Sequence, residues 1–553
     1  MADQLSKNSE RHGGTVLIDA LAQQGVERVF CVPGESFLAA LDGLYDSAVD
    51  VIVNRQEGGS AMMAEADGKL TGRPGVAFVT RGPGATNAAA GVHIAFQDST
   101  PMVLFVGQVA SDQRDREAFQ EVDYRAMFGP LAKWVAEIDR TDRIPEYVSR
   151  AFHTAMSGRP GPVVLALPED VLSAPCAAPV LPKAEAARQG ASLDDIERII
   201  SDLQTASKPF LLVGGGGWDA DARRALGDFA TAMQVPVGTS FRCQDYIDNR
   251  HSHYAGDVGI AINPALAARI HEADQLVVLG ARLGEMTTGG YTLIDAPKPS
   301  QRLTHVHSDP SEVGRVYWPT HGVGAKPANV IKQLAAKANV TSNVARGLDV
   351  EVMRNAFNEW KQPVATPGPV QMETVVRHLN ETLADDAIIT NGAGNYAGWV
   401  HRYYMFRGWR TQLAPTSGSM GYGLPAAVAA KLRYPDRDVI CFAGDGCFQM
   451  ISQEFGTACQ YGANVVILIH NNGIYGTIRM HQEKNYPGRV SGTAMVNPDF
   501  AALARSYGAF GATVERTQDF APAFAEARAS NLPAILDLRV SSEALTTTAR
   551  LAS

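Results

Sequence analysis

The sequence predicts an α/β protein made of three doubly wound parallel-sheet domains. Short apolar runs alternate along most of the chain with stretches of helical character, which is the pattern of strands joined by crossover helices. These runs end abruptly in glycine or small polar residues, as the buried strands of a parallel sheet do. The chain also has 553 residues, too many for a single hydrophobic core, so several domains are expected.

Two proline-bearing stretches divide the chain. Residues 174–179 are rich in alanine and proline, and residues 362–369 hold three prolines and a glycine. Such composition is typical of linkers between domains. The predicted domains are residues 1–185 at the N-terminus, residues 186–355 in the middle and residues 356–553 at the C-terminus.

The N-terminal domain alternates strand and helix. Strands are expected at residues 28–32, 51–53, 76–79, 102–106 and 159–168, and helices at residues 16–24, 37–45, 60–70 and 89–96. Glu57 directly follows one of these strands and precedes a helix rich in small residues. Taken alone, this carboxylate is best explained as a favourable charge at the start of a helix, although it could also approach a ligand. The loop Gly82-Pro83-Gly84 is most simply a turn.

The central domain is again α/β and Rossmann-like in outline. Strands are expected at residues 210–213, 275–280 and 303–307, with a helix at residues 222–233. The glycines at 214–217 leave a nucleotide site open, but they do not form G-x-G-x-x-G with an acidic residue about twenty positions later. His305 and His307 alternate on one strand and could share a face. Without a third ligand nearby, a structural role for both is favoured over a metal site.

The C-terminal domain carries the most informative strand ends. Strands are expected at residues 387–390 and within the runs 437–446 and 463–472, and helices at residues 374–383, 426–431 and 452–461. The last two strands lead into Gly444-Asp445-Gly446 and Asn471-Asn472. Parallel strands joined by one crossover helix would set Asp445 beside Asn472 at the carboxyl edge of the sheet, where ligands bind. Their oxygens, with glycines that let backbone come close, suit a hard divalent cation holding a diphosphate.

Composition argues against several classes of function. The formal net charge of −9 and the pI of about 5.8 leave no basic stripe for nucleic acid. No apolar run approaches the length of a membrane span, and the first residues show no secretory signal. The six cysteines are scattered without metal-binding spacing, which indicates a reducing compartment. We therefore expect a cytoplasmic protein whose partners are small molecules.

Together, these motifs resemble those of a known family. Gly444-Asp445-Gly446 and Asn471-Asn472, separated by twenty-four residues and each placed after an apolar run, are similar to the signature of thiamine-diphosphate-dependent enzymes. Arg55-Gln56-Glu57-Gly58 resembles the segment that carries the activating glutamate of that family. Residues 418–425 resemble its cofactor-bending segment. With this resemblance, the functional explanation of Glu57 becomes the favoured one.

Two further segments indicate one branch of that family. Residues 118–121 and 159–163 are similar to the acetolactate synthase branch. The resemblance spans nearly the whole chain. It implies that the three predicted domains are, in order, a pyrimidine-binding, a central and a diphosphate-binding domain.

The resemblance also implies roles for individual residues. Mg²⁺ would be held by Asp445, the side chain of Asn472 and the backbone oxygen of Ile474. Glu57 would hydrogen-bond the pyrimidine ring of thiamine diphosphate and promote removal of its C2 proton, while Met420 would force the cofactor into a bent shape. The other expected cofactor contacts are Gly392, Asn395, Gly418, Ser419, Gly444, Gly446, Cys447 and Tyr475. In the family this glutamate serves a cofactor held by a second subunit, so a homodimer or homotetramer with active sites at the subunit interface is expected.

The substrate depends on residues where the chain departs from its branch. His481 stands where acetolactate synthases that use 2-ketobutyrate carry Trp, and Asn395 stands in a segment that lacks their His-Gln pair. Phe119-Gln120 replaces the His-His pair of pyruvate decarboxylases. Glu35 occupies a strand end where other branches place a residue that handles protons. The expected catalytic group is Glu57, Glu35, Phe119, Gln120, Asn395 and His481.

The implied activity is that of a Mg²⁺-dependent carboligase or lyase acting on 2-keto acids or aldehydes, as in acetolactate formation after decarboxylation of pyruvate. Alternatives within this chemistry are benzaldehyde-lyase-like or 2-hydroxyacyl-CoA-lyase-like cleavage and ligation of acyloins, and simple decarboxylation of a 2-keto acid. Residues 280–286 only partly resemble the flavin-contacting segment of the branch, which leaves FAD open. From other classes, a dinucleotide-dependent oxidoreductase and a catalytically silent binding protein remain; Glu57, Asp445 and Asn472 argue against the second.

Overall fold

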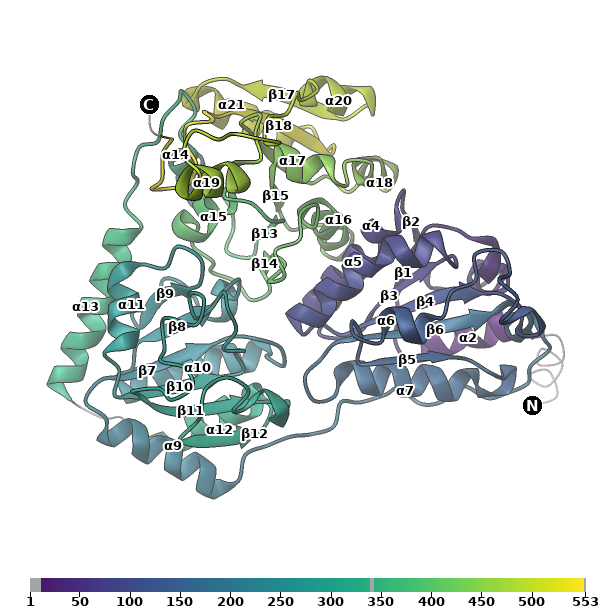
Figure 1. Ribbon diagram of the computed structural model, residues 1–553, viewed down its shortest axis with the longest axis horizontal. Coiled ribbons are helices and arrows are strands. Elements are labelled where there is room, and N and C mark those ends of the chain that lie inside the picture. Colours follow the sequence, from purple (N-terminus) through teal and green to yellow (C-terminus); the bar gives the residue numbers. More distant parts are fainter. Residues whose placement is uncertain (1–10, 339–342, 552–553) are drawn as a thin grey trace. The chain divides into compact units, whose positions relative to one another are not determined.

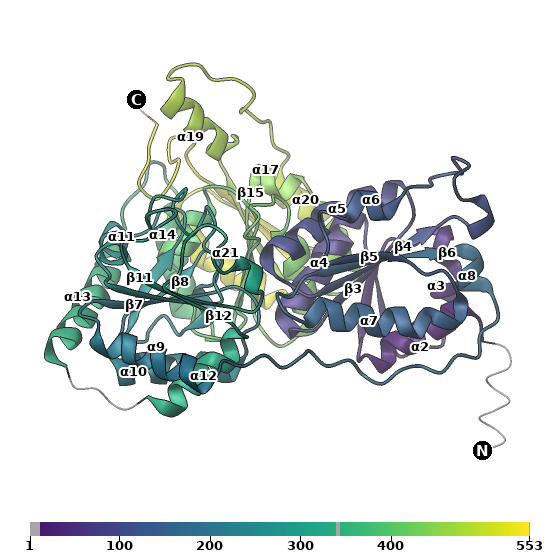
Figure 2. The ribbon, with the colours of Figure 1, turned by 60° about the horizontal axis from the view of Figure 1, so that its bottom comes forward.

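A computed structural model describes residues 11–338 and 343–551 of the chain. Within these ranges the chain forms three six-stranded sheets, and the strands of each sheet pair in parallel. Helices flank the sheets (Figure 1 and Figure 2). The expected fold class, three parallel α/β sheets, is confirmed.

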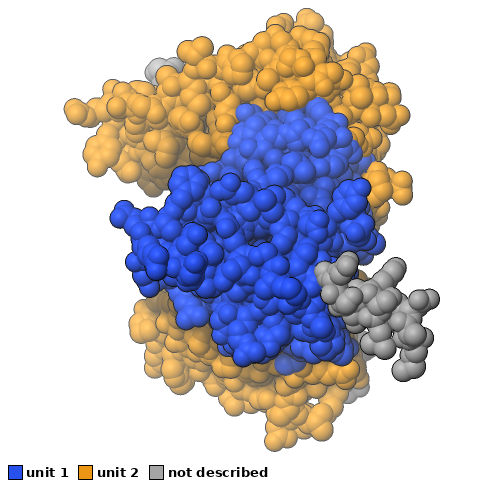
Figure 3. All heavy atoms as spheres, turned by 90° about the vertical axis from the view of Figure 1, so that its right-hand side faces the viewer, with its two compact units in different colours: residues 1–187, 428–433, 451–461 blue, residues 188–427, 434–450, 462–553 orange. Residues whose placement is uncertain are grey.

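The chain clusters into two compact units, coloured blue and orange in Figure 3. Unit 1 comprises residues 1–187, 428–433 and 451–461, and unit 2 comprises residues 188–427, 434–450 and 462–553. The first sheet belongs to unit 1, and the central and last sheets belong to unit 2. Unit 1 therefore includes two short segments from the last third of the sequence as well as the first third.

The first sheet has the strand order β2-β1-β3-β4-β6-β5. Its strands are β1 (Arg28–Cys31), β2 (Asp50–Val53), β3 (Gly75–Val79), β4 (Met102–Gln108), β5 (Trp134–Glu137) and β6 (Pro162–Pro168). Its helices are α2 (Gly13–Gln23), α3 (Leu38–Tyr45), α4 (Glu57–Thr71), α5 (Pro83–Asp98), α6 (Tyr124–Phe128), α7 (Ile144–Met156) and α8 (Glu169–Ser173). The order reverses at β1 and β3, because β1 pairs with β2 on one side and with β3 on the other. Ligands in such sheets bind beyond the carboxyl ends of the strands at this point, and Glu35 and Arg81 lie there.

The central sheet has the order β12-β11-β10-β7-β8-β9. Its strands are β7 (Pro209–Val213), β8 (Val237–Ser240), β9 (Tyr254–Val258), β10 (Gln275–Leu279), β11 (Arg302–His307) and β12 (His321–Gly324). Its helices are α9 (Leu193–Thr205), α10 (Ala220–Met233), α11 (Pro264–His271), α12 (Pro327–Lys337) and α13 (Val344–Trp360). The order reverses between β7 and β10, whose ends lead into Gly214 and Gly280.

The last sheet has the order β14-β13-β15-β16-β18-β17. Its strands are β13 (Ile388–Asn391), β14 (Gln412–Leu413), β15 (Val439–Gly444), β16 (Val466–Asn471), β17 (Phe510–Val514) and β18 (Ala534–Arg539). Helices of this part of the sequence are α14 (Met372–Thr382), α15 (Ala397–Tyr403), α16 (Gly423–Arg433), α17 (Asp445–Gln449), α18 (Glu454–Gln460), α19 (Gly476–Asn485), α20 (Phe500–Ser506) and α21 (Thr517–Ala529). The order reverses between β13 and β15, whose ends lead into Gly392 and Asp445.

Burial on both faces explains why the strands read as unbroken apolar runs. β4, β6, β15 and β16 are buried along their whole length. In the last sheet, Ile440 and Leu468 join one continuous core with Trp399 and Tyr403 of α15. A strand that is covered on both faces has no solvent side and so shows no polar alternation.

Several helices begin earlier than the sequence predicts, and three of them carry or adjoin candidate site residues. α4 begins at Glu57 instead of Ser60, α5 at Pro83 instead of Ala89 and α16 at Gly423 instead of Ala426. The side chain of Gln56 caps α4 by accepting a hydrogen bond from Gly59 N at 3.0 Å. Pro83 suits the first turn of α5, where its missing N–H would have no helical partner anyway. The segment Gly82-Pro83-Gly84 is therefore a helix start instead of a simple turn, and Glu57 lies inside the first turn of α4.

Two helices, instead of the single one predicted at 452–461, lie between β15 and β16. The chain enters α17 directly after Gly444, which takes the extended N-cap conformation, and α18 follows after a short turn. None of the helices in the described ranges has the length and apolar character needed to cross a membrane.

Candidate active site

The ends of β15 and β16 come together at the carboxyl edge of the last sheet. The two strands pair in parallel with Gly444 opposite His470, so the residues that follow them are neighbours. Asp445 Oδ2 accepts a hydrogen bond from Gly473 N at 2.7 Å. The structure thus brings Asp445 against the segment 472–474, as the strand pattern predicts.

Asp445 is a buried carboxylate that accepts hydrogen bonds from neutral groups. Besides Gly473 N, its donors are Gly446 N at 2.8 Å and Asn497 Nδ2 at 2.7 Å. Burial raises the pKa of Asp445 above its ordinary value, although these N–H groups act in the opposite direction. Because burial disfavours the ionised form, a cation beside Asp445 would stabilise the carboxylate.

The oxygens at the corner formed by Asp445 and the turn 472–474 fit Mg²⁺. The Asp445 carboxylate, the Asn472 amide oxygen and the Ile474 carbonyl are hard donors of the kind that Mg²⁺ prefers. Asn472 Oδ1 already faces this turn, because it accepts a hydrogen bond from Ile474 N at 3.2 Å. Over the described ranges, no group of three His, Cys, Asp or Glu side chains could hold a metal ion by itself. Mg²⁺ here would therefore depend on further oxygens, such as those of a diphosphate.

Asn497 completes this corner and is not predicted from the sequence. Its side-chain nitrogen lies 2.7 Å from Asp445 Oδ2 and 2.8 Å from Asn471 Oδ1. Asn471 in turn donates to Asp537 Oδ1 at 2.8 Å. Asn497 stands in the irregular stretch between α19 and α20, where no periodic pattern could signal its role.

The turn after Asn472 is fixed by residues 493–495. Tyr475 N donates to Thr493 O, and Met495 N donates to Gly473 O, each at 2.9 Å. A Cβ at position 446 would lie 2.7 Å from the Tyr475 ring, so glycine is required at that position. The turn that carries Asn472, Ile474 and Tyr475 is thus packed closely against the start of α17.

Cys447 links two glycine segments of the last sheet. Its sulfur accepts hydrogen bonds from Tyr396 OH and Gly421 N, each at 3.2 Å. Tyr396 OH also accepts from Gly392 N at 3.0 Å. A Cβ at position 392 would lie 2.5 Å from Cys447 Sγ, which explains the glycine there. The end of β13 therefore lies beside the segment that leads into α16, and Tyr396 is a member of this group that the sequence does not predict.

The expected cofactor-bending segment contains a left-handed residue and a half-buried methionine. Gly418 has φ +68°, which favours glycine. Ser419 Oγ lies 3.0 Å from Ser417 Oγ. Met420 packs against the core of the last sheet and keeps part of its side chain accessible. Core packing and contact with a ligand are therefore compatible at Met420.

Arg242 from the central sheet ties two of these segments together. This buried arginine donates to Gly392 O at 3.0 Å and also to Pro415 O. Its own φ is +62°, an uncommon value for a residue other than glycine. Arg242 thus holds the end of β13 beside the segment that leads to Gly418, a role without a sequence signal.

The expected catalytic residues divide between the two units. Glu57, Glu35, Phe119 and Gln120 belong to unit 1, and Asn395 and His481 belong to unit 2. Glu57 Oε2 accepts a hydrogen bond from Asn87 Nδ2 at 2.9 Å. Asn87 lies on α5, so two adjacent helices of unit 1 fix the glutamate side chain.

Arg81 is hydrogen-bonded to two of the other expected catalytic residues of unit 1, Glu35 and Phe119. Its side chain donates to Glu35 Oε1 at 3.2 Å and to Phe119 O at 3.0 Å, and it also pairs with Glu169. The Phe119 side chain is 71% exposed, and Gln120 has φ +65°. Glu35, Phe119 and Gln120 therefore lie together at the reversal point of the first sheet, around an arginine that the sequence does not single out.

In unit 2, Asn395 packs against α19, the helix that carries His481. Asn395 N donates to Thr477 Oγ1 at 3.1 Å, and Thr477 donates back to Asn395 Oδ1 at 3.0 Å. His481 is exposed, and every residue of α19 is at least partly exposed. The structure thus associates Asn395 with the same helix as His481, without a contact between the two side chains.

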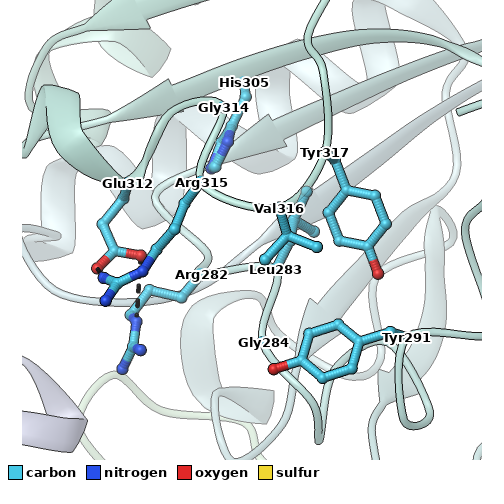
Figure 4. A pocket seen from close by; sticks show the side chains of 10 residues that line it. All are labelled: Arg282, Leu283, Gly284, Tyr291, His305, Glu312, Gly314, Arg315, Val316 and Tyr317. Atoms are coloured by element: carbon cyan, nitrogen blue, oxygen red, sulfur yellow. Dashed lines mark hydrogen bonds and ion pairs between the residues drawn. The ribbon is translucent and has the colours of Figure 1, made fainter. Parts of the chain in front are cut away.

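The central sheet carries a separate pocket that is partly open to solvent. Figure 4 shows Tyr291 and Tyr317 on one side of it and a charged group on the other. In that group, Glu312 lies 2.7 Å from Arg315 and 3.5 Å from Arg282. The pocket also contains Leu283, Val316 and His305. Burial lowers the pKa of His305 to about 4, and its ring nitrogen lies 3.1 Å from Ala281 O, as suits a structural histidine.

Family comparisons match all three parts of the chain. The N-terminal thiamine pyrophosphate (TPP) binding domain matches residues 11–127, the central domain of these enzymes matches residues 196–334, and the C-terminal TPP binding domain matches residues 392–538. Thiamine pyrophosphate is another name for thiamine diphosphate. The C-terminal match includes the corner formed by Asp445 and Asn472, and the N-terminal match includes Glu57.

Individual curated proteins are similar to this chain over nearly its full length. The chain is 32% identical to the acetolactate synthase large subunit of Corynebacterium glutamicum, over 96% of this chain and 87% of the relative. It is 33% identical to the large subunit of Parasynechococcus marenigrum, with the same coverage, and 30% identical to acetolactate synthase isozyme 3 large subunit of Escherichia coli, over 93% and 92%. The chain therefore belongs to the thiamine-diphosphate-dependent enzymes, on the branch of the acetolactate synthase large subunits.

Proposed function

We propose that the protein is a Mg²⁺-dependent carboligase that decarboxylates pyruvate or a similar 2-keto acid and joins the remaining acyl unit to a second carbonyl compound. The main support for this proposal is that Asp445, at the end of β15, is hydrogen-bonded to the turn 472–474, at the end of the neighbouring strand β16. A buried carboxylate with a raised pKa beside amide and carbonyl oxygens is suited to a divalent cation that neutralises a diphosphate. The names of the relatives support the acetolactate synthase-like form of the chemistry.

Thiamine diphosphate would supply the carbon nucleophile and the electron sink for this reaction. Asp445, Asn472 and the carbonyl of Ile474 would hold Mg²⁺, and Asn497 would keep the Asp445 carboxylate in place. Glu57 would hold a proton at the pyrimidine ring, with Asn87 fixing its side chain. A proton acceptor held beside a very weak carbon acid gains rate through effective concentration.

We assign contact with the substrates to five residues: Glu35, Phe119, Gln120, Asn395 and His481. Arg81 supports this assignment because it fixes Glu35 and the backbone of Phe119 together. Phe119 offers an exposed apolar surface, and His481 offers an exposed polar one. The size and polarity of the second carbonyl compound would depend on these two side chains.

We also assign a homodimer or homotetramer, in which Glu57 of one subunit serves the cofactor of the next. Glu57 belongs to unit 1, whereas the residues assigned to the metal belong to unit 2. A cytoplasmic location is part of the same proposal, and the six free cysteines are consistent with it.

For FAD, the pocket of the central sheet is the proposed place. Its arginines could meet phosphate oxygens, and Tyr291 and Tyr317 could contact a flat ring (Figure 4). A visible absorption spectrum of the purified protein tests this assignment. Flavin bands near stoichiometric amount are expected, and a colourless protein without extractable flavin would reject it.

The activity is tested by incubating the protein with Mg²⁺, thiamine diphosphate and a panel of 2-keto acids and aldehydes. Products are identified by mass spectrometry. Acetolactate and carbon dioxide are expected from pyruvate. An aldehyde as the sole product from pyruvate would favour simple decarboxylation, and cleavage of acyloins without any reaction of keto acids would favour the lyase alternative.

A further inference from the structure

Glu454 is a fully buried carboxylate that the proposed reaction does not use. It lies at the start of α18, in the part of unit 1 that comes from the last third of the sequence. Its oxygen Oε1 accepts hydrogen bonds from Arg55 N at 3.0 Å and from Gln56 N at 2.9 Å. A buried carboxyl group needs such donors, because burial of its oxygens without hydrogen bonds is strongly unfavourable.

The second oxygen of Glu454 is also occupied. Oε2 accepts from Thr457 Oγ1 at 2.6 Å and from Asn54 Nδ2 at 3.2 Å. Four donors thus meet one carboxylate, and three of them come from the consecutive residues Asn54, Arg55 and Gln56. These residues connect β2 to α4, and the next residue is Glu57.

On the other side of Glu57, Gly59 also lies close to the Glu454 side chain. A Cβ at Gly59 would lie 2.6 Å from Glu454 Oε1 and 2.8 Å from its Cγ. A Cβ atom essentially never comes that close to another heavy atom, so the glycine makes room for the carboxylate. Glu454 is therefore confined by the backbone on both sides of Glu57.

A second set of bonds attaches α18 to the same strand without touching this connection. Tyr461 OH accepts from Val53 N at 2.8 Å and donates to Val51 O at 3.2 Å. Tyr461 thus fixes β2, whereas Glu454 fixes the turn between β2 and the first residue of α4. This division provides a matched control.

We propose that Glu454 is a positioning residue for Glu57: it orients the backbone of residues 54–56 and so aims the Glu57 carboxylate. This inference rests on the proposed role of Glu57 toward thiamine diphosphate. It assigns to the buried carboxylate no contact with the cofactor. Misplacement of a catalytic group by about 1 Å can lower a rate by about a hundredfold, so a group that fixes the turn before Glu57 controls the rate of proton removal.

The primary variant is Glu454→Ala, measured by deuterium exchange at C2 of bound thiamine diphosphate, with NMR after acid quench. We expect the exchange rate to fall at least about tenfold. The Kd for the cofactor with Mg²⁺ should stay within about threefold, since the residues assigned to the metal belong to unit 2. An exchange rate equal to wild type in the folded variant would overturn the proposal.

The conservative variant Glu454→Gln should restore most of the exchange rate. One amide oxygen can still accept from Arg55 N and Gln56 N. The amide nitrogen would face Asn54, whose own buried side-chain oxygen has no hydrogen-bond partner in the described part of the chain and can turn to accept. Recovery to within about threefold of wild type is expected, and a loss as large as that of Glu454→Ala would contradict the hydrogen-bonding role.

Two further variants complete the test. Tyr461→Phe should lower the Tm without slowing C2 exchange, and slowed exchange in it would contradict a specific role for Glu454. If Glu454→Ala does not fold, Glu454→Asp takes its place, because a side chain shorter by one methylene cannot reach both amides. Exchange at the wild-type rate in Glu454→Asp would then reject the proposal.

Glu57→Gln separates this inference from the proposed function. If Glu57→Gln exchanges C2 at the wild-type rate, the proposed activation by Glu57 is wrong. If Glu57→Gln loses exchange while Glu454→Ala keeps it, only the positioning role of Glu454 is wrong.

Discussion

Asp445 and Glu454 are two buried carboxylates only nine positions apart in the sequence, yet their surroundings differ. The donors to Asp445 come from its own neighbour Gly446 and from the segment that follows β16. The donors to Glu454, apart from Thr457, come from residues some 400 positions earlier. Burial raises the pKa of Asp445, and this agrees with the proposal that a cation binds beside its carboxylate. The comparison teaches that burial alone does not indicate the role of an acid. The segments that supply its hydrogen-bond donors are more informative.

The largest effect is expected from Asp445→Ala. Removal of the proposed metal ligand should weaken Mg²⁺-dependent binding of thiamine diphosphate by more than the roughly 100-fold that loss of a supporting residue can cause. Isothermal titration with and without Mg²⁺ measures this. Asp438→Ala is the matched control, since Asp438 lies at the other end of β15 and pairs with Arg528 on the surface. Unchanged binding in Asp445→Ala would remove the metal assignment.

Asn497→Ala should give the next largest effect. It removes the donor to both Asp445 and Asn471, so Mg²⁺-dependent cofactor binding should weaken about 10- to 100-fold. Gln449→Ala serves as the control, because Gln449 donates to the other end of the Asn497 side chain at 2.9 Å and to the backbone oxygen of Asp445 at 3.4 Å, but not to the Asp445 carboxylate. Equal losses in the two variants would show that Asn497 has no special role toward Asp445.

Gly59→Ala tests the other carboxylate. The new methyl group would press on Glu454, and overpacking of a buried site costs about 1–3 kcal/mol. The free energy of unfolding from urea denaturation should fall by that amount, both with and without Mg²⁺. Gly398→Ala, in α15, would bring the new Cβ to an ordinary contact distance of 4.0 Å from Thr547 Cγ2 and should be neutral or slightly stabilising. A Gly59→Ala protein as stable as wild type would mean that Glu454 is not held tightly.

A further prediction concerns Asp257, a partly buried acid near the end of β9. Burial raises its pKa to about 8, although Arg242 and Lys361 act in the opposite direction. Because this pKa exceeds that of the unfolded chain, the contribution of Asp257 to stability is complete below about pH 4 and is lost as the pH rises through 8. Asp257→Asn should therefore gain stability relative to wild type between pH 5 and pH 8, by at most about 1.4 kcal/mol per pH unit. Thermal unfolding at both pH values measures this, and a parallel pH dependence of the two proteins would contradict it.

The sequence predicts the sheets well, because strands buried on both faces read as apolar runs with clear ends. The pairing of Asp445 with the turn after β16 follows from this pattern and from the parallel connection between β15 and β16. The start of α4 is predicted less well, since Glu57, Gly58 and Gly59 resemble a loop. The cap from Gln56 and the bond from Gln56 N to Glu454, both tertiary or local side-chain contacts, support the helical start at Glu57.

The residues that the sequence does not reveal act through single tertiary contacts. Asn497 donates two hydrogen bonds from an irregular stretch, and Asn87 donates one from the helix α5. Arg81, Arg242 and Glu454 bridge segments that are distant along the chain. A pattern along the sequence records which face of an element is buried, but it carries no signal for a polar pair formed between elements.

The bond between Glu454 and Gln56 spans 398 residues, and this has a consequence during protein synthesis. A ribosome adds about 5–20 residues per second, so roughly 20–80 seconds separate the appearance of Gln56 from that of Glu454. During this interval the nascent first sheet can form, while the turn before Glu57 still lacks its anchor. Glu57, the proposed activating glutamate, therefore stays without this neighbouring anchor until Glu454 has been synthesised.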